Sequence, residues 1–205
     1  MLRLVAGLLS PTTGRVRRDG RPSVAYVAQH QGQHQWMPLT VEEVLRMSRH
    51  GRLGALRPAR AADRRAVDEA AGRLEVDDLR GRLFGDLSGG QRQQVLMASA
   101  VAADADAVLL DEPVTGLDIP SQRRIMSVIC EERDAGRLVV MSTHDLDEAR
   151  ECDRVVPLAG HVVAEGPPAG VLTRDHLATA FGTHLLTDGP EPEVIDDHGH
   201  GTHLH

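Results

Sequence analysis

The chain has 205 residues, enough for one domain with its own core or for one domain of two lobes. Its formal net charge of −7 argues against a general nucleic-acid binder, because such proteins usually present a basic face. No apolar run approaches the roughly 18 residues of a membrane span, and the apolar start at residues 1–9 lacks a signal-peptide cleavage site. Cys130 and Cys152 lie far apart without metal-ligand spacing, so we expect two reduced cytoplasmic thiols.

The first half of the chain predicts one strand and a set of helices. Residues 1–9 predict a helix that packs on a sheet, and residues 24–28 predict a short buried strand that ends at Gln29. Thr40 is a good helix N-cap, and Glu43 three residues later completes a capping box. From there to about Phe84 the pattern is mostly helical, which predicts an α-helical lobe.

The second half alternates helices with short apolar runs. Runs at 107–110 and 138–141 are separated by a predicted helix over about 120–135, and a helix over about 91–103 precedes them. This alternation predicts a parallel sheet that is buried on both faces. Two short runs around Gly160 predict an antiparallel hairpin at the sheet edge. Residues 187–205 are acidic and rich in Gly, Pro and His, and predict a flexible tail.

The sequence Leu-Ser-Gly-Gly-Gln at residues 87–91 directly precedes a predicted helix. Its two glycines allow a ligand to approach the backbone closely, and a helix start presents N–H groups to an anion. The Ser88 hydroxyl adds a donor. Taken alone, the stretch is more typical of an ordinary glycine turn with a serine cap than of a ligand site.

Polar side chains follow three of the predicted strands. Asp111 and Glu112 end one strand, at the edge where open α/β sheets bind ligands. An aspartate there can hold Mg²⁺ through water, and the glutamate can orient or deprotonate a water that attacks a phosphoryl group. Gln29 and His144 end two other strands, and His144 is a candidate γ-phosphate contact. The alternative for Asp111 and Glu112 is an acidic turn after a strand, and the alternative for His144 is a purely structural role.

These elements, in this order and spacing, resemble the ATP-binding subunits of ABC transporters. The residues that carry the resemblance are Gln29 (Q-loop), residues 87–91 (family signature), Asp111 and Glu112 (Walker B aspartate and catalytic glutamate), Gly116-Leu117-Asp118 (D-loop) and His144 (switch histidine). The resemblance covers essentially the whole chain.

The resemblance implies an α/β fold, with a P-loop NTPase-like (RecA-type) parallel sheet lobe and an inserted α-helical lobe at about residues 38–90. It assigns residues 1–186 to one ATPase domain, with ATP and Mg²⁺ as cofactors. Glu112 and His144 would be catalytic, and Gln29 and Asp111 would hold Mg²⁺. The nucleotide contacts would be Gln29, Ser88, Gly89, Gly90, Gln91, Asp111 and Asp118.

The family also implies partners. A second ATPase subunit would pair head to tail, so that each ATP lies between the P-loop of one subunit and the signature of the other. A membrane permease would receive the helical lobe, which places the chain at the cytoplasmic face of the membrane as a peripheral subunit. An extracytoplasmic metal-binding protein would belong to the same system, and no nucleic acid is expected.

One family feature is not found in this sequence. The family needs a Gly-rich loop followed by Lys and Ser or Thr at the start of a helix, and all 23 basic residues here are Arg. Residues 1–9 resemble the helix after that loop, so we expect the first strands and the lysine to precede Met1. A shortened sequence and a degenerate subunit that supplies only its signature remain open. Either way, we expect this polypeptide alone to bind ATP poorly and to hydrolyse it negligibly.

Several softer matches indicate the transported substrate. Residues 36–41, 49–54 and 180–186 resemble the manganese, zinc and iron uptake branch of the family. Four histidines of the tail are possible ligands of an ion such as Zn²⁺, with a solvated tail as the alternative: His198, His200, His203 and His205. An importer of another substrate, an ABC protein outside transport and a metal-binding module remain as alternative functions.

Overall fold

The computed structural model describes the whole chain except residues 21, 30–37, 50–59 and 182–205. Its contacts divide the chain into two compact units, residues 1–144 and 145–205. The assignment of residues 1–186 to one domain stays a prediction. The described part of the second unit contains the short helices α7 (Leu146–Arg150), α8 (Pro168–Val171) and α9 (Arg174–Phe181).

A parallel sheet of three strands lies in the first unit, in the order β1-β2-β3. Each strand coincides with one of the predicted apolar runs, so the α/β prediction is confirmed. In the central strand, Val108, Leu109 and Leu110 are at most 1% exposed, as expected for a strand that is covered on both faces. The strands are β1 (Val24–Val27), β2 (Ala107–Asp111) and β3 (Leu138–Ser142).

Three helices of the first unit contact the sheet: α1 packs on β2, α5 on β1 and α6 on β3. They are α1 (Leu2–Val5), α5 (Gly89–Ala102) and α6 (Ile119–Asp134). With 16 residues, α6 is the longest helix of the described part. None of the described helices has both the length and the apolar character that a membrane crossing requires.

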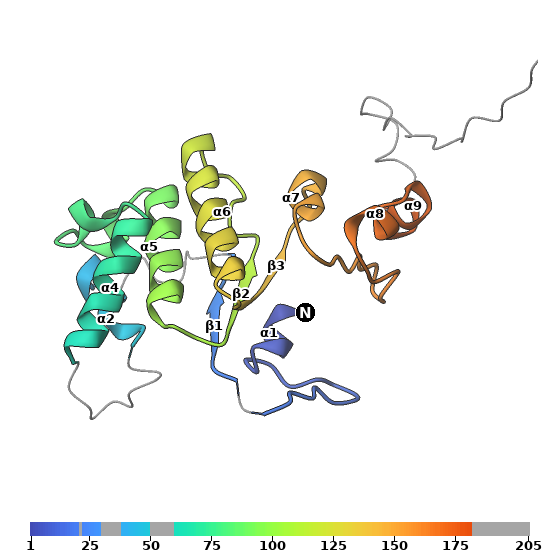
Figure 1. Cartoon of the computed structure of the whole chain (residues 1–205), viewed down its shortest axis with the longest axis horizontal. Helices are drawn as coiled ribbons and strands as arrows, with labels where there is room; N and C mark the ends of the chain where they lie inside the picture. The colour runs from blue at the N-terminus through green and yellow to red at the C-terminus, as the bar shows by residue number, and fades with distance from the viewer. Residues whose placement is uncertain (21, 30–37, 50–59, 182–205) are drawn as a thin grey trace, which may run out of the picture. The chain divides into compact units, whose positions relative to one another are not determined.

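The predicted helical lobe is confirmed. Helices α2 (Val41–Met47) and α4 (Ala61–Arg73) pack against each other and against α5, at the left of Figure 1. The Thr40 hydroxyl accepts a hydrogen bond from the Glu43 amide at 3.3 Å, and the Glu43 carboxylate accepts one from the Thr40 amide at 2.7 Å. This reciprocal pair is the predicted capping box, and it fixes the start of α2.

The predicted N-terminal helix is too long. Helix α1 ends at Val5, because Gly7 adopts a left-handed φ of 77° and the Leu8 amide folds back to the Arg3 carbonyl at 2.9 Å. Such a glycine commonly ends a helix. The apolar pattern predicted too long a helix because Leu8 is an apolar residue of the exposed chain beyond the helix, with 58% of its surface exposed.

The predicted hairpin around Gly160 is present only as isolated antiparallel bridges. Leu158 pairs with Val162 across the glycine, and Val155 pairs with Gly166 further out. Within the described part of the chain, neither of the two predicted runs on either side of Gly160 forms a strand. Two bridges provide too few ladder hydrogen bonds for a regular hairpin, which is marginal even when complete.

A buried carboxylate joins the helical lobe to the sheet lobe. Glu132 of α6 is 2% exposed, and its Oε1 accepts a hydrogen bond from Arg73 of α4 at 2.6 Å. Arg137, just before β3, binds the second oxygen of Glu132 and also donates to Asp104 at 2.8 Å. Since a buried charge is tolerated only when it is paired, these contacts make Glu132 a fixed joint between helices α4 and α6.

We expect Glu132→Ala to lower the free energy of unfolding by about 2 to 3 kcal/mol, because Arg73 and Arg137 each lose a hydrogen bond to a buried carboxylate. Urea denaturation followed by circular dichroism measures the loss. Glu131→Ala is the matched control, since Glu131 also binds Arg73 but its side chain is 51% exposed. The control should lose less than about 1 kcal/mol, and equal losses in the two variants would contradict the assignment.

Candidate functional site

The predicted side chains at the strand ends come together. Gln29 follows β1, Glu112 follows β2, and His144 follows β3. The Gln29 Nε2 donates to Glu112 Oε2 at 2.6 Å, and the His144 Nδ1 lies 3.6 Å from the same oxygen. Asp111 is the last residue of β2. The parallel pairing therefore gathers all four side chains at one edge of the sheet, as predicted.

Asp111 accepts one hydroxyl on each carboxylate oxygen. Ser142 Oγ donates to Oδ1 at 2.6 Å, and Tyr26 Oη donates to Oδ2 at 3.1 Å. Burial, and then the hydrogen bond to Asp111, raise the pKa of the Tyr26 hydroxyl above its ordinary value, so this group stays a proton donor. Sequence reasoning missed both hydroxyls. The available signal for Ser142 was its place directly after the apolar run at 138–141, while its pairing with Asp111 is seen only in the structure.

Glu112 has an uncommon backbone conformation. Its φ of 48° lies in the left-handed region, which costs a non-glycine residue about 1 kcal/mol or more. Its amide donates to both the carbonyl oxygen and the Oγ of Ser142, each at 3.1 Å. Its carboxylate accepts hydrogen bonds from Gln29 and, at 3.1 Å, from Thr115. These bonds hold the strained turn and direct the carboxylate across the strand ends.

The donor set at this edge suits a magnesium ion. Mg²⁺ prefers one or two carboxylates together with water and phosphate oxygens. Asp111 offers a fixed carboxylate, and the amide oxygen of Gln29 is the second predicted ligand. The hydrogen-bond partners of the Glu112 and Asp111 carboxylates are all polar N–H or O–H groups. The residues present therefore fit the predicted ion.

Residues 88–91 form the start of α5. The Ser88 hydroxyl accepts a hydrogen bond from the Gln91 amide at 3.2 Å, and the Gln91 side chain accepts one from the Ser88 amide at 3.1 Å. This capping box gives both side chains a structural role. A side-chain carbon added at Gly89 would meet no atom within 4 Å, so a ligand can approach that backbone. Nucleotide contact by these residues stays a prediction.

Asp118 caps helix α6. Its Oδ1 accepts a hydrogen bond from the Ser121 amide at 3.0 Å, and its Oδ2 accepts one from the Ser121 hydroxyl at 2.9 Å. The first of these bonds is the main cause of a pKa below the ordinary value for this carboxyl. A side-chain carbon at Gly90 would lie 3.5 Å from Asp118 Oδ2, so the starts of α5 and α6 are neighbours. The predicted nucleotide contact of Asp118 is untested.

Other predicted features lie outside the described residues. They include the tail histidines 198–205 and most of the stretches that resemble the metal-uptake branch. Within the described ranges, no disulfide joins Cys130 and Cys152, and no three His, Cys, Asp or Glu side chains group as a metal site would require. The lysine expected before Met1 concerns residues that the sequence does not include, and it stays a prediction.

Strand ends that deliver an amide, two carboxylates and an imidazole to one edge of a parallel sheet are typical of an α/β phosphate-binding domain. The profile of the ABC transporter family matches residues 1–115. A solved structure of a metal-chelate type ABC transporter in an inward-facing conformation superposes with a TM-score of 0.75 at 25% identity. The alignment covers 88% of this chain and 71% of that one.

Three curated relatives have similar sequences. The chelated iron transport system membrane protein YfeB of Yersinia pestis is 34% identical over 191 residues, which cover 89% of this chain and 64% of YfeB. The manganese transport system ATP-binding protein MntA of Synechocystis sp. is 34% identical, with coverage of 89% and 74%. The zinc transport system ATP-binding protein TroB of Treponema pallidum is 33% identical, with coverage of 100% and 81%.

The chain therefore belongs to the ABC transporter family, as the motifs predicted. It spans less than two thirds of the length of YfeB.

We expect the stability contributed by the Asp118 cap to depend on pH. A carboxyl whose folded pKa lies below its unfolded value of 3.8 stabilises the fold above that value and loses its contribution as the pH falls through the folded pKa. Asp118→Asn keeps an acceptor but does not titrate. The melting temperature of the wild type should exceed that of the variant near neutral pH, and the difference should shrink below about pH 4. A difference that is constant from acid to neutral pH would contradict this.

Proposed function

We propose that this chain is the ATP-binding subunit of an importer that couples ATP hydrolysis to uptake of a divalent metal ion of the manganese, zinc or iron type. The observation that carries the proposal is the set of contacts around Glu112, which joins groups from all three strand ends. The similarity to YfeB, MntA and TroB, which are named for transport of chelated iron, manganese and zinc, supports the metal substrate.

Glu112 is the residue best placed to act on water. Its Oε2 is held by Gln29 and Thr115, so the carboxylate is oriented before a substrate binds. In that position it can orient or deprotonate a water for in-line attack on the γ-phosphate. His144, with 67% of its side chain exposed, has room to contact the transferred phosphoryl group. Mg²⁺, held by Asp111 and Gln29, would neutralise charge on the phosphates.

A second surface would serve the ATP of a partner subunit. The start of α5 supplies Ser88, Gly89, Gly90 and Gln91, and Asp118 lies beside it. N–H groups in the first turn of a helix have no intrahelical acceptor, so they attract phosphate oxygens. In a head-to-tail dimer this surface would close over a nucleotide that is bound mainly by the other subunit.

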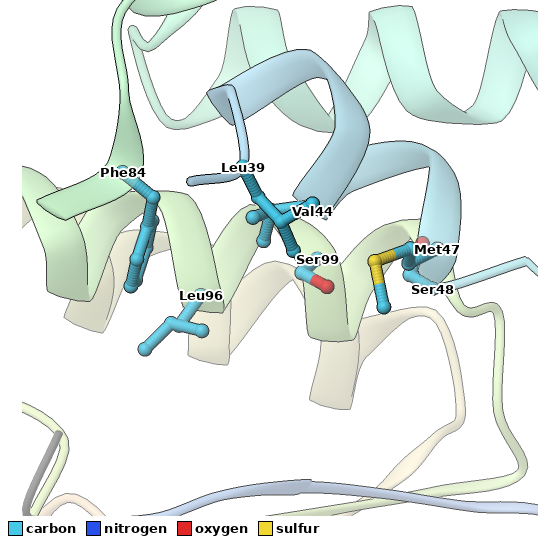
Figure 2. Close-up of a pocket in the computed structure, with 7 residues that line it drawn as sticks. All are labelled: Leu39, Val44, Met47, Ser48, Phe84, Leu96 and Ser99. Carbon is cyan, nitrogen blue, oxygen red and sulfur yellow. The ribbon is translucent and has the colours of Figure 1, made fainter. Parts of the chain in front are cut away.

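The permease would dock on the helical lobe. A cavity of about 300 Å³ lies between α2 and α5, and Figure 2 shows its mostly apolar lining. Exposed apolar surface of this kind marks a contact site for another protein. Leu39, which lines this cavity, follows Gln29 of the site closely in the sequence. This short connection would link ATP binding to the permease. The lining residues are Leu39, Val44, Met47, Ser48, Phe84, Leu96 and Ser99.

This arrangement would place the chain at the cytoplasmic face of the membrane as a peripheral subunit. An extracytoplasmic metal-binding protein would deliver the ion to the other side of the permease. The same placement would serve an importer of another substrate, so the cargo is the part of the proposal that an uptake measurement must decide.

The test of function is metal uptake by cells that carry a deletion of this gene. We expect the deletion to lower uptake of Mn²⁺, Zn²⁺ or Fe²⁺, the wild-type gene to restore it, and Glu112→Gln to leave it at the deletion level, because Gln cannot accept a proton. Glu131→Gln, the same exchange at an exposed remote residue, should restore uptake. Full uptake with Glu112→Gln would refute the catalytic role, and unchanged uptake of all three ions in the deletion strain would refute the metal cargo.

The docking surface is tested by Met47→Glu, which adds a charge to an apolar lining where Met47 is 54% exposed. We expect at least a tenfold loss of permease recovered with the tagged chain from detergent-solubilised membranes, since a desolvated unpaired charge costs several kcal/mol. Val162→Glu is the control, because Val162 is similarly exposed (56%) in the second unit. Equal recovery with both variants would place the permease elsewhere.

A further inference from the structure

Asp111, Tyr26 and Ser142 form a set of three side chains in which two hydroxyls bind one carboxylate. Each hydroxyl takes a different carboxylate oxygen, Ser142 at 2.6 Å and Tyr26 at 3.1 Å. A carboxylate that accepts one donor on each oxygen cannot rotate without breaking a bond. Its remaining lone pairs therefore have fixed directions.

The sheet register places the three side chains together. Asp111 pairs directly with Ser142, and Tyr26 pairs with Leu109. Residues two apart on a strand share a face, so Leu109 and Asp111 project to the same side, as do their partners. Three neighbouring strands thus contribute one residue each to a common face. The arrangement depends on backbone pairing and not on a flexible loop.

Ser142 also ties the two acids to each other. Its hydroxyl donates to Asp111 and accepts from the Glu112 amide at 3.1 Å, so one oxygen atom bridges the aspartate side chain and the backbone of the glutamate. That backbone has the left-handed φ of 48°. The hydroxyl is therefore coupled both to the carboxylate predicted to hold the metal and to the turn that aims the predicted base.

We propose that Ser142 and Tyr26 are positioning residues that orient the Asp111 carboxylate for a divalent cation, with Ser142 also setting the turn at Glu112. The proposal rests on the proposed function, since it assumes that Asp111 meets the cation of a nucleotide. Groups that hold a metal ligand in place commonly change metal affinity by about 10- to 100-fold when removed.

The hydroxyl contact is tested without nucleotide. Tyr26 is the single tyrosine of the chain, so the tyrosine doublet in the Raman spectrum of the purified protein reports the hydrogen bond of this hydroxyl alone. We expect Asp111→Asn to change the intensity ratio of the doublet, because a hydroxyl donates a weaker hydrogen bond to a neutral amide than to a carboxylate. Ser127→Ala, which removes an exposed serine bonded to Glu131, should leave the ratio unchanged. An unchanged ratio in Asp111→Asn would overturn the proposal and would leave the proposed function standing.

The effect on the cation is tested on the assembled transporter, because this chain alone is expected to bind ATP poorly. The readout is the electron paramagnetic resonance spectrum of the Mn²⁺ that the protein binds together with ATP. We expect Ser142→Ala and Tyr26→Phe each to weaken the Mn²⁺ binding that Asp111→Asn abolishes, by about tenfold. Ser142→Thr should bind as the wild type does, since it keeps the hydroxyl and suits a strand. Thermal unfolding shows whether each variant is folded. In Ser142→Ala the Glu112 amide keeps its bond to the carbonyl of residue 142.

The outcomes separate the two claims. Wild-type Mn²⁺ affinity in folded Ser142→Ala and Tyr26→Phe, together with a loss in Asp111→Asn, would overturn the positioning role alone. Equal weakening in Ser142→Ala and Ser142→Thr would also overturn it, because a packing defect and not the hydroxyl would be the cause. Asp111→Asn with unaltered Mn²⁺ binding would overturn both the positioning role and the proposed site.

Discussion

Parallel pairing of β1, β2 and β3 is the constraint on which the site depends. Parallel strands all end at the same edge of a sheet, so residues that follow each strand meet although they are far apart in sequence. Gln29 and Glu112 are 83 residues apart along the chain and share a 2.6 Å hydrogen bond. A shift of one residue in the register would turn Asp111 and Ser142 to opposite faces.

In two places in the first unit, backbone strain or buried charge is held by several bonds. The left-handed turn at Glu112 is kept by two bonds from its own amide and two to its carboxylate. Glu132, far from the candidate acids in sequence, is buried between arginines that join α4 to α6. The bonds at Glu112 fix the carboxylate of the candidate base. The bonds at Glu132 fix the helical lobe, which carries the cavity of Figure 2.

Local sequence patterns were sufficient to predict much of the fold and several residues of the site. Apolar runs predicted the three strands, and the capping box at Thr40 predicted the start of α2, because both signals involve only neighbouring residues. Gln29 and His144 were predictable as members of the site since each directly follows a strand. The start of α1 was predicted correctly, but its end depended on the left-handed Gly7, which apolar periodicity does not report.

The remaining contacts could be found only from the three-dimensional structure, which shows how the strands and helices pair. Tyr26 lies within an apolar run and read as core, and its contact with Asp111 follows only from the pairing of β1 with β2. The joint at Glu132 was equally hidden, because its arginine partners are 59 and 5 residues away and a glutamate on an amphipathic helix normally faces solvent. Side-chain hydrogen bonds between distant segments have no local sequence signal.

The central claim is that the edge formed by Gln29, Asp111, Glu112 and His144 receives the phosphates and magnesium of ATP. A cryo-electron microscopy map of the assembled transporter, trapped with Mg²⁺ and ATP by Glu112→Gln, tests it most directly. The account predicts the ion beside Asp111 and Gln29, and the γ-phosphate in contact with His144. A nucleotide bound with these side chains still facing solvent in every subunit of this chain would contradict it.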